Sequence, residues 1–510
     1  MLDAAARQSP DRRAVTCDGE SLTYREYAAC VAGFALELQA AGVGGGTRVV
    51  LLMANSLDIA IATFAVQAAG AQVVPLNPAY TASELGPMLA DADPAAIVFD
   101  SALAPTVTPL LAALERAATA HADAERAVLR IEIGATSRRL TAWHREPGLA
   151  ARLPLPDPDA LSTLQYTGGT TGRSKGVDLA HRAVAVNVSQ REALLPTRPE
   201  HDVVLVATPL FHVYAVAMGL YLAAYARATL VIVARYRPET VLEAIARHGV
   251  TLLAASPTIL VGLLGCAAFA HADLRSLRLC FSGASALPQA TLERWEAATG
   301  CPVAEGYGQS EAGPVLAYNP AQGVRKIGSV GVALPATRIE IVDLETGCVV
   351  QPDGRAGEIR ARGPQLMRGY RNLPEETAAA LRDGWLHTGD IGALDGEGYL
   401  FIRGRKKEMV IVGGFNVYPR EVEEALCAHP KVAEAAVVGV PDAYRGEALV
   451  ATVVARDASV GADELLAHLA QRLVRYKLPS ALRFVAALPK TGIGKVDKVA
   501  LRDEILRSAG

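Results

Sequence analysis

Short apolar stretches alternate with helical stretches through the first hundred residues of the chain. Val49–Ala54 and Gln72–Leu76 are apolar runs of strand length, and the segment 56–69 between them has helical spacing and stops at Gly70. Ala95–Phe99 is a third run that is apolar on both faces. Strands buried on both faces belong to parallel sheets that helices cover on each side. The alternation therefore predicts an α/β fold with mostly parallel sheets.

The pattern changes toward the C-terminus. Short strands among Gly and Pro turns predict a β-rich subdomain, and they are Leu277–Phe281, Arg338–Val342 and Glu358–Ala361. From Tyr418 onward a helix, two strands, a second helix and a strand follow in a compact α+β order. With a boundary near Gly404, we expect a large N-terminal domain at residues 1–403 and a small, mobile C-terminal domain at residues 404–510.

Charge and cysteine content exclude several classes of protein. Lys and Arg number 50 against 53 Asp and Glu, a formal net charge of −3, so no basic field exists for nucleic acid. The seven cysteines form no Cys-x-x-Cys pair and no regular framework. The first residues carry charges and no apolar segment of the signal-peptide type. We expect a cytoplasmic protein, peripheral to a membrane at most if its substrate is a long-chain lipid.

One apolar stretch is long enough to cross a bilayer. Val203–Ala226 contains no Lys, Arg, Asp or Glu. Pro209 and His212 interrupt it, and a β-like run at Val203–Ala207 opens it. A buried strand followed by a buried helix therefore fits better than an integral membrane segment.

A loop rich in Gly and Thr is the strongest local signal. Leu164–Gly176 reads LQYTGGTTGRSKG, in which glycines permit a tight backbone path, N–H and hydroxyl groups can surround a phosphate, and Lys175 adds a positive charge. The spacing is not that of the Walker P-loop, because Lys175 lies three residues beyond Gly172 and is followed by Gly176. The loop predicts a phosphate site of another kind.

Four further segments follow that loop in a fixed order: EGYGQSE at 305–311, GWLHTGD at 384–390, GRKKE at 404–408 and PKTGIGK at 489–495. With them, almost the whole chain resembles the adenylate-forming superfamily of acyl-CoA synthetases, luciferases and peptide-synthetase adenylation domains, and most closely the bacterial fatty-acyl-CoA synthetases. The resemblance implies an ATP- and Mg²⁺-dependent ligase that uses CoA. It activates a carboxylic acid as acyl-AMP and then passes the acyl group to a thiol.

The resemblance also implies a set of nucleotide contacts. Thr167 and Glu311 would hold Mg²⁺, Asp390 and Arg405 would bind the ribose, and Tyr307 would stack on adenine. The full set implied for ATP and AMP is Thr167, Gly168, Gly169, Thr170, Thr171, Gly172, Lys175, Gly283, Ala284, Ser285, Gly306, Tyr307, Gly308, Ser310, Asp390 and Arg405.

Lys495 resembles the family's catalytic lysine, whose ammonium would neutralise charge between the carboxylate and the α-phosphate. Lys407 stands at the family's hinge position, and Gly413 and Gly414 would approach the pantetheine arm of CoA. These matches imply that the small domain rotates between the two reaction steps. Homodimers are common in the family, but no part of the sequence specifies an interface.

The acid is expected to bind beside the segment PLFHVYA at 209–215. His212 is expected to gate this pocket and, with Lys495 and Glu311, to be a catalytic residue. The expected pocket consists of His212, Val213, Tyr214, Met218, Gly308 and Ala312. These walls are apolar and show no cation for a second carboxylate, which indicates an apolar monocarboxylic acid. The resemblance to fatty-acyl-CoA synthetases implies a fatty acid of medium or long chain.

Three alternatives stay open. SEAGPV at 310–315 also resembles coumarate-CoA ligases, so an aryl acid is the alternative substrate. An acyl-AMP ligase that loads a carrier-protein thiol would carry an insertion near the domain junction, and none is seen between Leu400 and Tyr418. A catalytically dead relative would be expected to lack Lys495, Asp390 or Glu311, and all three are present.

Overall fold

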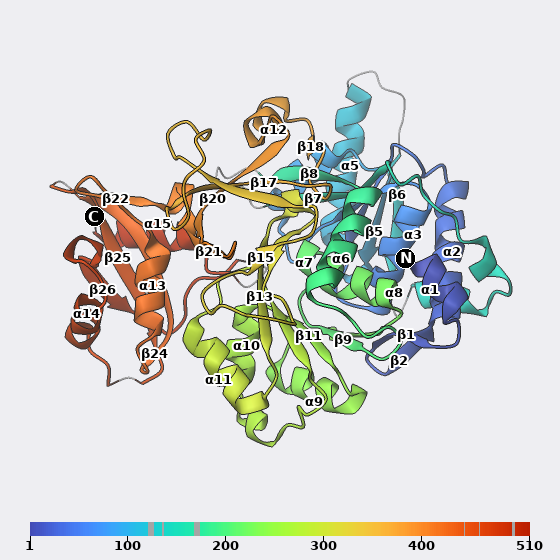
Figure 1. The fold of residues 1–510 in the computed structure, drawn as a ribbon. Helices are drawn as coiled ribbons and strands as arrows, with labels where there is room; N and C mark the ends of the chain where they lie inside the picture. Colours follow the sequence, from blue (N-terminus) through green and yellow to red (C-terminus); the bar gives the residue numbers. More distant parts are fainter. Residues whose placement is uncertain are drawn as a thin grey trace.

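The computed structural model describes residues 1–120, 127–134, 137–167, 174–442, 444–457, 459–491 and 495–509. Two large sheets form the N-terminal two thirds of the molecule (Figure 1). The first has seven strands in the order β18 (Gly369–Tyr370), β8 (Lys175–Ala180), β7 (Leu161–Thr167), β4 (Gln72–Pro75), β3 (Arg48–Leu52), β5 (Ala96–Asp100) and β6 (Leu129–Ile133). The five strands from β7 to β6 are parallel, and β8 and β18 add antiparallel at one edge.

The second sheet has nine strands. Their order is β15 (Val332–Ala333), β14 (Val315–Tyr318), β13 (Val303–Gly308), β12 (Leu279–Ser282), β11 (Leu252–Ala255), β9 (Val203–Val206), β10 (Thr229–Ile232), β1 (Arg13–Cys17) and β2 (Glu20–Thr23). The six strands from β13 to β1 are parallel. The expectation of mostly parallel sheets is confirmed for both.

Helices cover these sheets as the βαβ pattern requires. They are α1 (Leu2–Gln8), α2 (Tyr24–Ala40), α3 (Leu57–Ala68), α4 (Ala82–Ala92), α5 (Ala104–Ala120), α6 (His181–Leu194), α9 (Pro238–His248), α10 (Pro257–Leu264) and α11 (Gln289–Thr299). The first of the long helices begins at a capping box in which Thr23 and Glu26 satisfy each other's backbone N–H groups. The packed faces of α2 and α3 belong to the largest hydrophobic cluster in the described structure.

An antiparallel sheet follows in the chain. It consists of β16 (Arg338–Val342), β17 (Gly357–Arg362), β20 (Trp385–Leu394), β19 (Leu381–Arg382) and β21 (Leu400–Arg405), with the short helix α12 (Pro374–Ala380) beside it. This is the β-rich subdomain that the sequence predicts. Its long strand β20 crosses toward the two large sheets in Figure 1.

A fourth sheet with its own helices forms the smaller C-terminal domain. The strands are β23 (Phe415–Val417), β22 (Val410–Val412), β25 (Gly446–Ala455), β24 (Val432–Asp442) and β26 (Ala481–Phe484), and the helices are α13 (Pro419–Cys427), α14 (Ala462–Ala470) and α15 (Lys498–Ala509). Its main core is separate from those of the large sheets and is built on Val417, Val437 and Val453. The fold is therefore α/β with a large N-terminal and a small α+β C-terminal domain, as predicted.

The apolar stretch Val203–Ala226 is a strand followed by a buried helix. After β9 the chain forms α7 (Val213–Ala215), a π-helical segment η4 (Val216–Tyr221) and α8 (Leu222–Ala226). The widened π turn is rare and is frequent at functional sites. Among the described residues, no helix has the length and apolar character that a membrane crossing requires.

Tyr24 ties the first long helix to the nine-stranded sheet. Its hydroxyl lies 2.8 Å from the carbonyl oxygen of Ala223 and 2.6 Å from that of Ala228, and the side chain is 1% exposed. We expect Tyr24→Phe to destabilise the protein by about 1–3 kcal/mol, because it leaves buried carbonyl groups without their donor. Thermal unfolding followed by intrinsic fluorescence measures the effect. The control is Tyr225→Phe in the same region, where the tyrosine is 40% exposed, and an equal loss in both variants would contradict the assignment.

Candidate active site

The two ends of the Gly- and Thr-rich loop are fixed by a pair of antiparallel strands. Thr167 ends β7 and Lys175 begins β8, and these two residues pair directly across the ladder. The Thr167 hydroxyl lies 3.4 Å from the carbonyl oxygen of Lys175. The predicted phosphate contacts between them, Gly168, Gly169, Thr170, Thr171 and Gly172, lie outside the described residues. A loop closed in this way starts and ends at one point on the edge of the seven-stranded sheet.

Glu311 lies next to this loop because of a tyrosine that the motifs did not include. The hydroxyl of Tyr370 donates to Glu311 Oε1 at 2.8 Å, and the Lys175 ammonium lies 4.9 Å from the centre of the Tyr370 ring. Burial raises the pKa of the Glu311 carboxyl, although the bond from Tyr370 opposes that shift. A nearby cation would favour the charged form of such a buried carboxylate, and carboxylate oxygens are ligands that hard cations prefer.

A second buried carboxylate lies at the junction of the β-rich subdomain and the large sheets. The Tyr307 hydroxyl at the end of β13 donates to Asp390 Oδ2 on β20 at 2.6 Å. Arg405 faces Asp390 directly across the β20–β21 ladder, with Nε 3.5 Å from Oδ1. Burial raises the pKa of Asp390, while Arg405 lowers it. Tyr307, Asp390 and Arg405 are therefore brought together, as the motif matches imply.

Lys495 reaches the same junction from the C-terminal domain. An isolated bridge between Lys490 and Val496, and a bond from the Thr491 N–H to the Lys495 carbonyl oxygen at 2.7 Å, hold the lysine in place. Burial lowers the pKa of Lys495 to about 8; the positive charge of Arg405 adds to the shift and Asp390 opposes it. The structure thus places the lysine beside Asp390 and Arg405.

His212 lies within electrostatic reach of Lys495, and burial keeps its imidazole neutral. Burial lowers the pKa of His212 to about 3, and the charge of Lys495 contributes. Its Nδ1 accepts a hydrogen bond from the N–H of Tyr214 at 3.2 Å, so this nitrogen carries no proton. A neutral imidazole with its proton on Nε2 can donate a hydrogen bond but cannot serve as a cation above pH 4.

Glycines allow the backbone to pack closely around the predicted adenine slot. A Cβ on Gly306 would lie 2.4 Å from Tyr318, one on Gly283 would lie 2.9 Å from the ring of Tyr214, and one on Gly308 would lie 1.8 Å from the carbonyl oxygen of Pro314. Ala284 follows with a positive φ of 70°, a conformation that non-glycine residues rarely adopt. Ser285 continues this turn, and Ser310 and Ala312 flank Glu311 in a short 3-10 turn.

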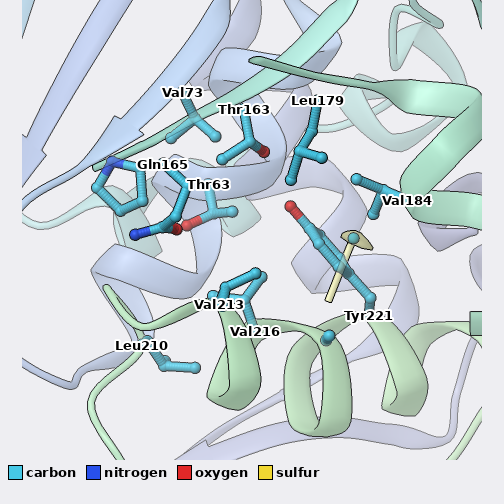
Figure 2. A pocket seen from close by; sticks show the side chains of 13 residues that line it. Thr63, Val73, Thr163, Gln165, Leu179, Val184, Leu210, Val213, Val216 and Tyr221 are labelled. Atoms are coloured by element: carbon cyan, nitrogen blue, oxygen red, sulfur yellow. The ribbon is translucent and has the colours of Figure 1, made fainter. Parts of the chain in front are cut away.

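A narrow apolar cavity lies between β7 and the helical segment α7–η4. Its lining consists of Thr63, Val73, Pro75, Thr163, Gln165, Leu179, Val184, Leu210, Val213, Val216, Ala217, Tyr221 and Gly313. Its enclosed volume is about 20 Å³, which is room for about one water molecule. Figure 2 shows these side chains pointing into it from the strand, the helix and the neighbouring elements. Val213 belongs to the predicted pocket, whereas the other side chains were not predicted.

Other predicted pocket residues lie behind this lining. Tyr214 is buried, with its hydroxyl 3.0 Å from the carbonyl oxygen of Phe281, and Met218 is 1% exposed within the main core.

Gly413 and Gly414, the residues predicted to approach CoA, form the tip of the β22–β23 hairpin with positive φ angles of 56° and 86°. Figure 1 shows β22, the strand that precedes these glycines, on the side of the small domain away from the large sheets. Lys407 lies in the short turn η7 (Lys406–Glu408) that connects the two domains.

Comparison with known families finds two matching models, one for the large N-terminal part of the chain and one for the C-terminal part. A model described as "AMP-binding enzyme" matches residues 2–371, and one described as "AMP-binding enzyme C-terminal domain" matches residues 421–495. The chain belongs to the AMP-binding enzyme family. Glu311 lies in the part matched by the first model and Lys495 in the part matched by the second, whereas Asp390 and Arg405 lie in the residues between the two matches.

Individual relatives cover nearly the full chain. A long-chain-fatty-acid–CoA ligase of Bacillus subtilis (strain 168) is 37% identical over 525 residues, 99% of this chain and 93% of the relative. A feruloyl-CoA synthase of an Amycolatopsis species is 37% identical over 508 residues, 99% of this chain and 97% of that one. The crystal structure of ATP-bound MatB from Rhodopseudomonas palustris superposes with a TM-score of 0.89 at 32% identity, covering 99% and 98% of the two chains.

Sequence reasoning missed Tyr370 and most of the cavity. Tyr370 follows an Arg-Gly pair in a loop-like stretch, and its pairing with Glu311 spans 59 residues of chain. Thr163 and Gln165 could have been predicted, because residues two apart on a strand share a face and both lie on the same face of β7 as Thr167. Tyr221 sits in an apolar run where nothing in the spacing separates it from ordinary core residues.

The lowered pKa of Lys495 gives a prediction that does not depend on catalysis. The Lys495 amine should lose its proton with a midpoint near pH 8, against about 10.4 for an unperturbed lysine. Removing the positive charge in Arg405→Gln should raise this midpoint, and removing the negative charge in Asp390→Asn should lower it. Competitive amine labelling across pH, with the Lys495 peptide quantified by mass spectrometry, measures each midpoint. Equal midpoints in all three proteins would contradict this electrostatic account.

Proposed function

We propose that this protein is an ATP-dependent acid–CoA ligase that activates a medium- or long-chain fatty acid. The acid would form acyl-AMP with release of pyrophosphate, and CoA would then displace AMP to give acyl-CoA. The observation that carries the proposal is the convergence of Lys495, Asp390 and Arg405 at the junction of the β-rich subdomain and the C-terminal domain. Similarity over 99% of the chain to long-chain-fatty-acid–CoA ligases supports the same activity.

The charged groups at the junction suit the first step. The carboxylate of the acid would attack the α-phosphorus of ATP, and negative charge would increase on the oxygens between them. The protonated amine of Lys495 would neutralise that charge in a site where burial strengthens electrostatic interactions. Asp390 would accept hydrogen bonds from the ribose hydroxyls, and Tyr307, which is bonded to Asp390, would offer its ring to adenine.

The donors at the phosphate end fit a magnesium ion. Mg²⁺ is usually held by one or two protein oxygens, with phosphate oxygens and water as its remaining ligands. Glu311, buried and with a raised pKa, and the Thr167 hydroxyl at the loop edge provide such oxygens. When bound, the ion would supply charge neutralisation at the phosphates. Glu311 would be kept in position by the hydroxyl of Tyr370.

The second step requires the small domain to move. Gly413 and Gly414 follow β22, which lies on the side of the small domain away from the large sheets in the conformation described. We place the hinge at Lys407 and the division of the chain at residues 1–403 and 404–510, because η7 connects the antiparallel sheet of one domain to the sheet of the other. Rotation there would withdraw Lys495 and bring the glycine hairpin toward the pantetheine thiol.

An aryl acid is the second candidate substrate. The feruloyl-CoA synthase is as similar to this chain as the fatty-acid ligase, at 37% identity. The decisive assay is pyrophosphate release with Mg-ATP across fatty, benzoic and cinnamic acids, each with and without CoA. We expect turnover that requires both a fatty acid and CoA. Preference for cinnamic acids would favour the aryl alternative, release without CoA would indicate a carrier-protein acceptor, and silence across the panel would refute the proposed ligase.

Replacing Lys495 should separate the two half-reactions. We expect Lys495→Ala to slow acyl-AMP formation by about a hundredfold or more, because a charge that stabilises the transition state is lost. Formation of acyl-CoA from supplied acyl-AMP should be retained, since the lysine is withdrawn in that step. Rapid-quench measurement of each half-reaction tests this. The matched control is Lys490→Ala, which removes a lysine of the same loop whose ammonium donates to Glu434 Oε1 at 2.9 Å. Equal loss of both half-reactions in Lys495→Ala would contradict the proposed role of Lys495 in adenylation.

A further inference from the structure

The short turn η7 that connects the two domains is held by an ion pair at each of its ends. Lys406, its first residue, donates from its ammonium to Glu358 Oε2 at 3.1 Å, and Glu358 lies on β17 of the large domain. Glu408, its last residue, accepts from the ammonium of Lys498 at 3.1 Å, and Lys498 begins α15 of the small domain. The residue between these two anchored positions is Lys407, where we place the hinge.

The large-domain end of this turn is anchored on both faces of the antiparallel sheet. Arg405 pairs with Asp390 across the β20–β21 ladder, and Glu358 pairs with Ile391 across the β17–β20 ladder. Successive residues of a strand point to opposite faces, so Asp390 and Ile391 lie on different sides of the sheet. Asp390 therefore holds Arg405 on one face, and Glu358 holds Lys406 on the other.

Burial of Glu358 favours a lasting bond to Lys406. The glutamate is 4% exposed, and a buried carboxylate that loses its partner is strongly unfavourable. A second base lies beside it, because Nδ1 of His387 is 3.9 Å from the same Glu358 oxygen and has no hydrogen-bond partner among the described residues. Burial and the charges of Arg382 and Arg360 lower the pKa of His387, although Glu358 opposes that shift, so the imidazole is neutral at pH 7. Lys406 is thus the cation that neutralises Glu358.

The small-domain end of the turn is anchored as firmly. The ammonium of Lys498 bonds to Glu408 and also lies 2.8 Å from Glu423 Oε1 on α13. Lys498 follows Lys495 by three residues, so this anchor also fixes the segment that carries the lysine. A rotation that keeps both ion pairs must take place between Lys406 and Glu408.

We propose that Glu358 is a positioning residue that, through Lys406, fixes the large-domain end of the hinge and confines the domain rotation to Lys407. This inference rests on the proposed ligase function, because that function requires two defined orientations of the small domain. Glu358 and Asp390 lie on opposite faces of the sheet, so Glu358 acts on the reaction through the turn. With the pair intact, Lys495 returns to one position beside Asp390. Without the pair, the small domain would adopt a wider range of orientations.

The direct test measures the distance between the domains by double electron–electron resonance in saturating Mg-ATP. Spin labels are attached at Ala246→Cys on α9 and Ala467→Cys on α14, two exposed positions, in a protein that carries Cys348→Ser to remove an exposed thiol. The same protein without the two added cysteines gives the background signal. We expect Glu358→Gln and Lys406→Met each to broaden the distance distribution, because the turn is then held on one face of the sheet only.

The matched control is Glu340→Gln. Glu340 is a buried carboxylate of the same sheet, 8% exposed, that accepts from Arg360 Nε at 3.0 Å. It lies on β16, which two strands separate from β21, so its loss should leave the distance distribution as narrow as in the wild type. Lys406→Arg keeps a cation opposite Glu358 and should also keep the narrow distribution.

The rate of acyl-CoA formation gives a second readout. We expect Glu358→Gln and Lys406→Met each to lower kcat by about tenfold, because Lys495 is then less precisely placed. KM for ATP should be retained, since most of the proposed nucleotide contacts belong to the large domain. The double variant should be no slower than the slower single variant, because both changes break the same pair. Lys406 is 40% exposed, so Lys406→Met covers the case in which Glu358→Gln does not fold.

Each outcome supports or overturns the proposal. Unchanged distance distributions in both Glu358→Gln and Lys406→Met would overturn it, as would equal broadening in Glu340→Gln. Additive losses of kcat in the double variant would show that the two residues act separately, which also overturns it. If the wild-type protein activates no acid, the proposed function fails, and the distance distributions still decide whether Glu358 holds the hinge. Wild-type activity with unchanged distributions would refute only the inference about Glu358.

Discussion

Burial of charge at the junction of the two domains is the constraint on which the rest of the site depends. Glu311 and Asp390 have raised pKa values and Lys495 a lowered one, each chiefly because burial disfavours the charged form. Carboxylates whose folded pKa is raised reduce stability as pH rises above their unfolded pKa, so this group of residues opposes folding at neutral pH. Such a site persists only if the surrounding structure stabilises it. Bound phosphates and their counterion would offset the free-energy cost of burying these charged side chains.

That support comes from the ends of parallel strands. Thr167 ends β7, Gly283 follows β12, and Gly306 and Gly308 close β13, so all of these residues lie at carboxyl ends of strands in the two large sheets. Open α/β sheets bind their ligands at this edge, because side chains and free backbone groups from several strands meet there. The cores of the sheets fix the strand ends. The loops that follow can then hold strained or polar residues such as Ala284.

Sequence reasoning succeeded where a short pattern has one structural solution. The apolar runs of the βαβ units and the capping box at Thr23 specify their elements locally, and the structure reproduces them. It failed where the contact depends on the meeting of distant segments. Tyr370 reaches Glu311 from β18, which adds to the edge of β8, and Tyr221 lines the cavity from a π-helical segment. Neither arrangement can be read from residue spacing, so the sequence does not distinguish Tyr370 or Tyr221 from an ordinary core tyrosine.

The links around the proposed hinge argue that the small domain moves as one body. Lys498, at the start of α15, bonds to Glu408 in η7 at 3.1 Å and to Glu423 on α13 at 2.8 Å. The segment that carries Lys495 is thereby fixed to the connecting turn and to the small domain's main helix. A rotation at η7 must then withdraw the lysine and carry the hairpin tip together. One motion would thus remove the group needed for adenylation as it brings in the surface needed for thioester formation, which prevents the two steps from sharing a single geometry.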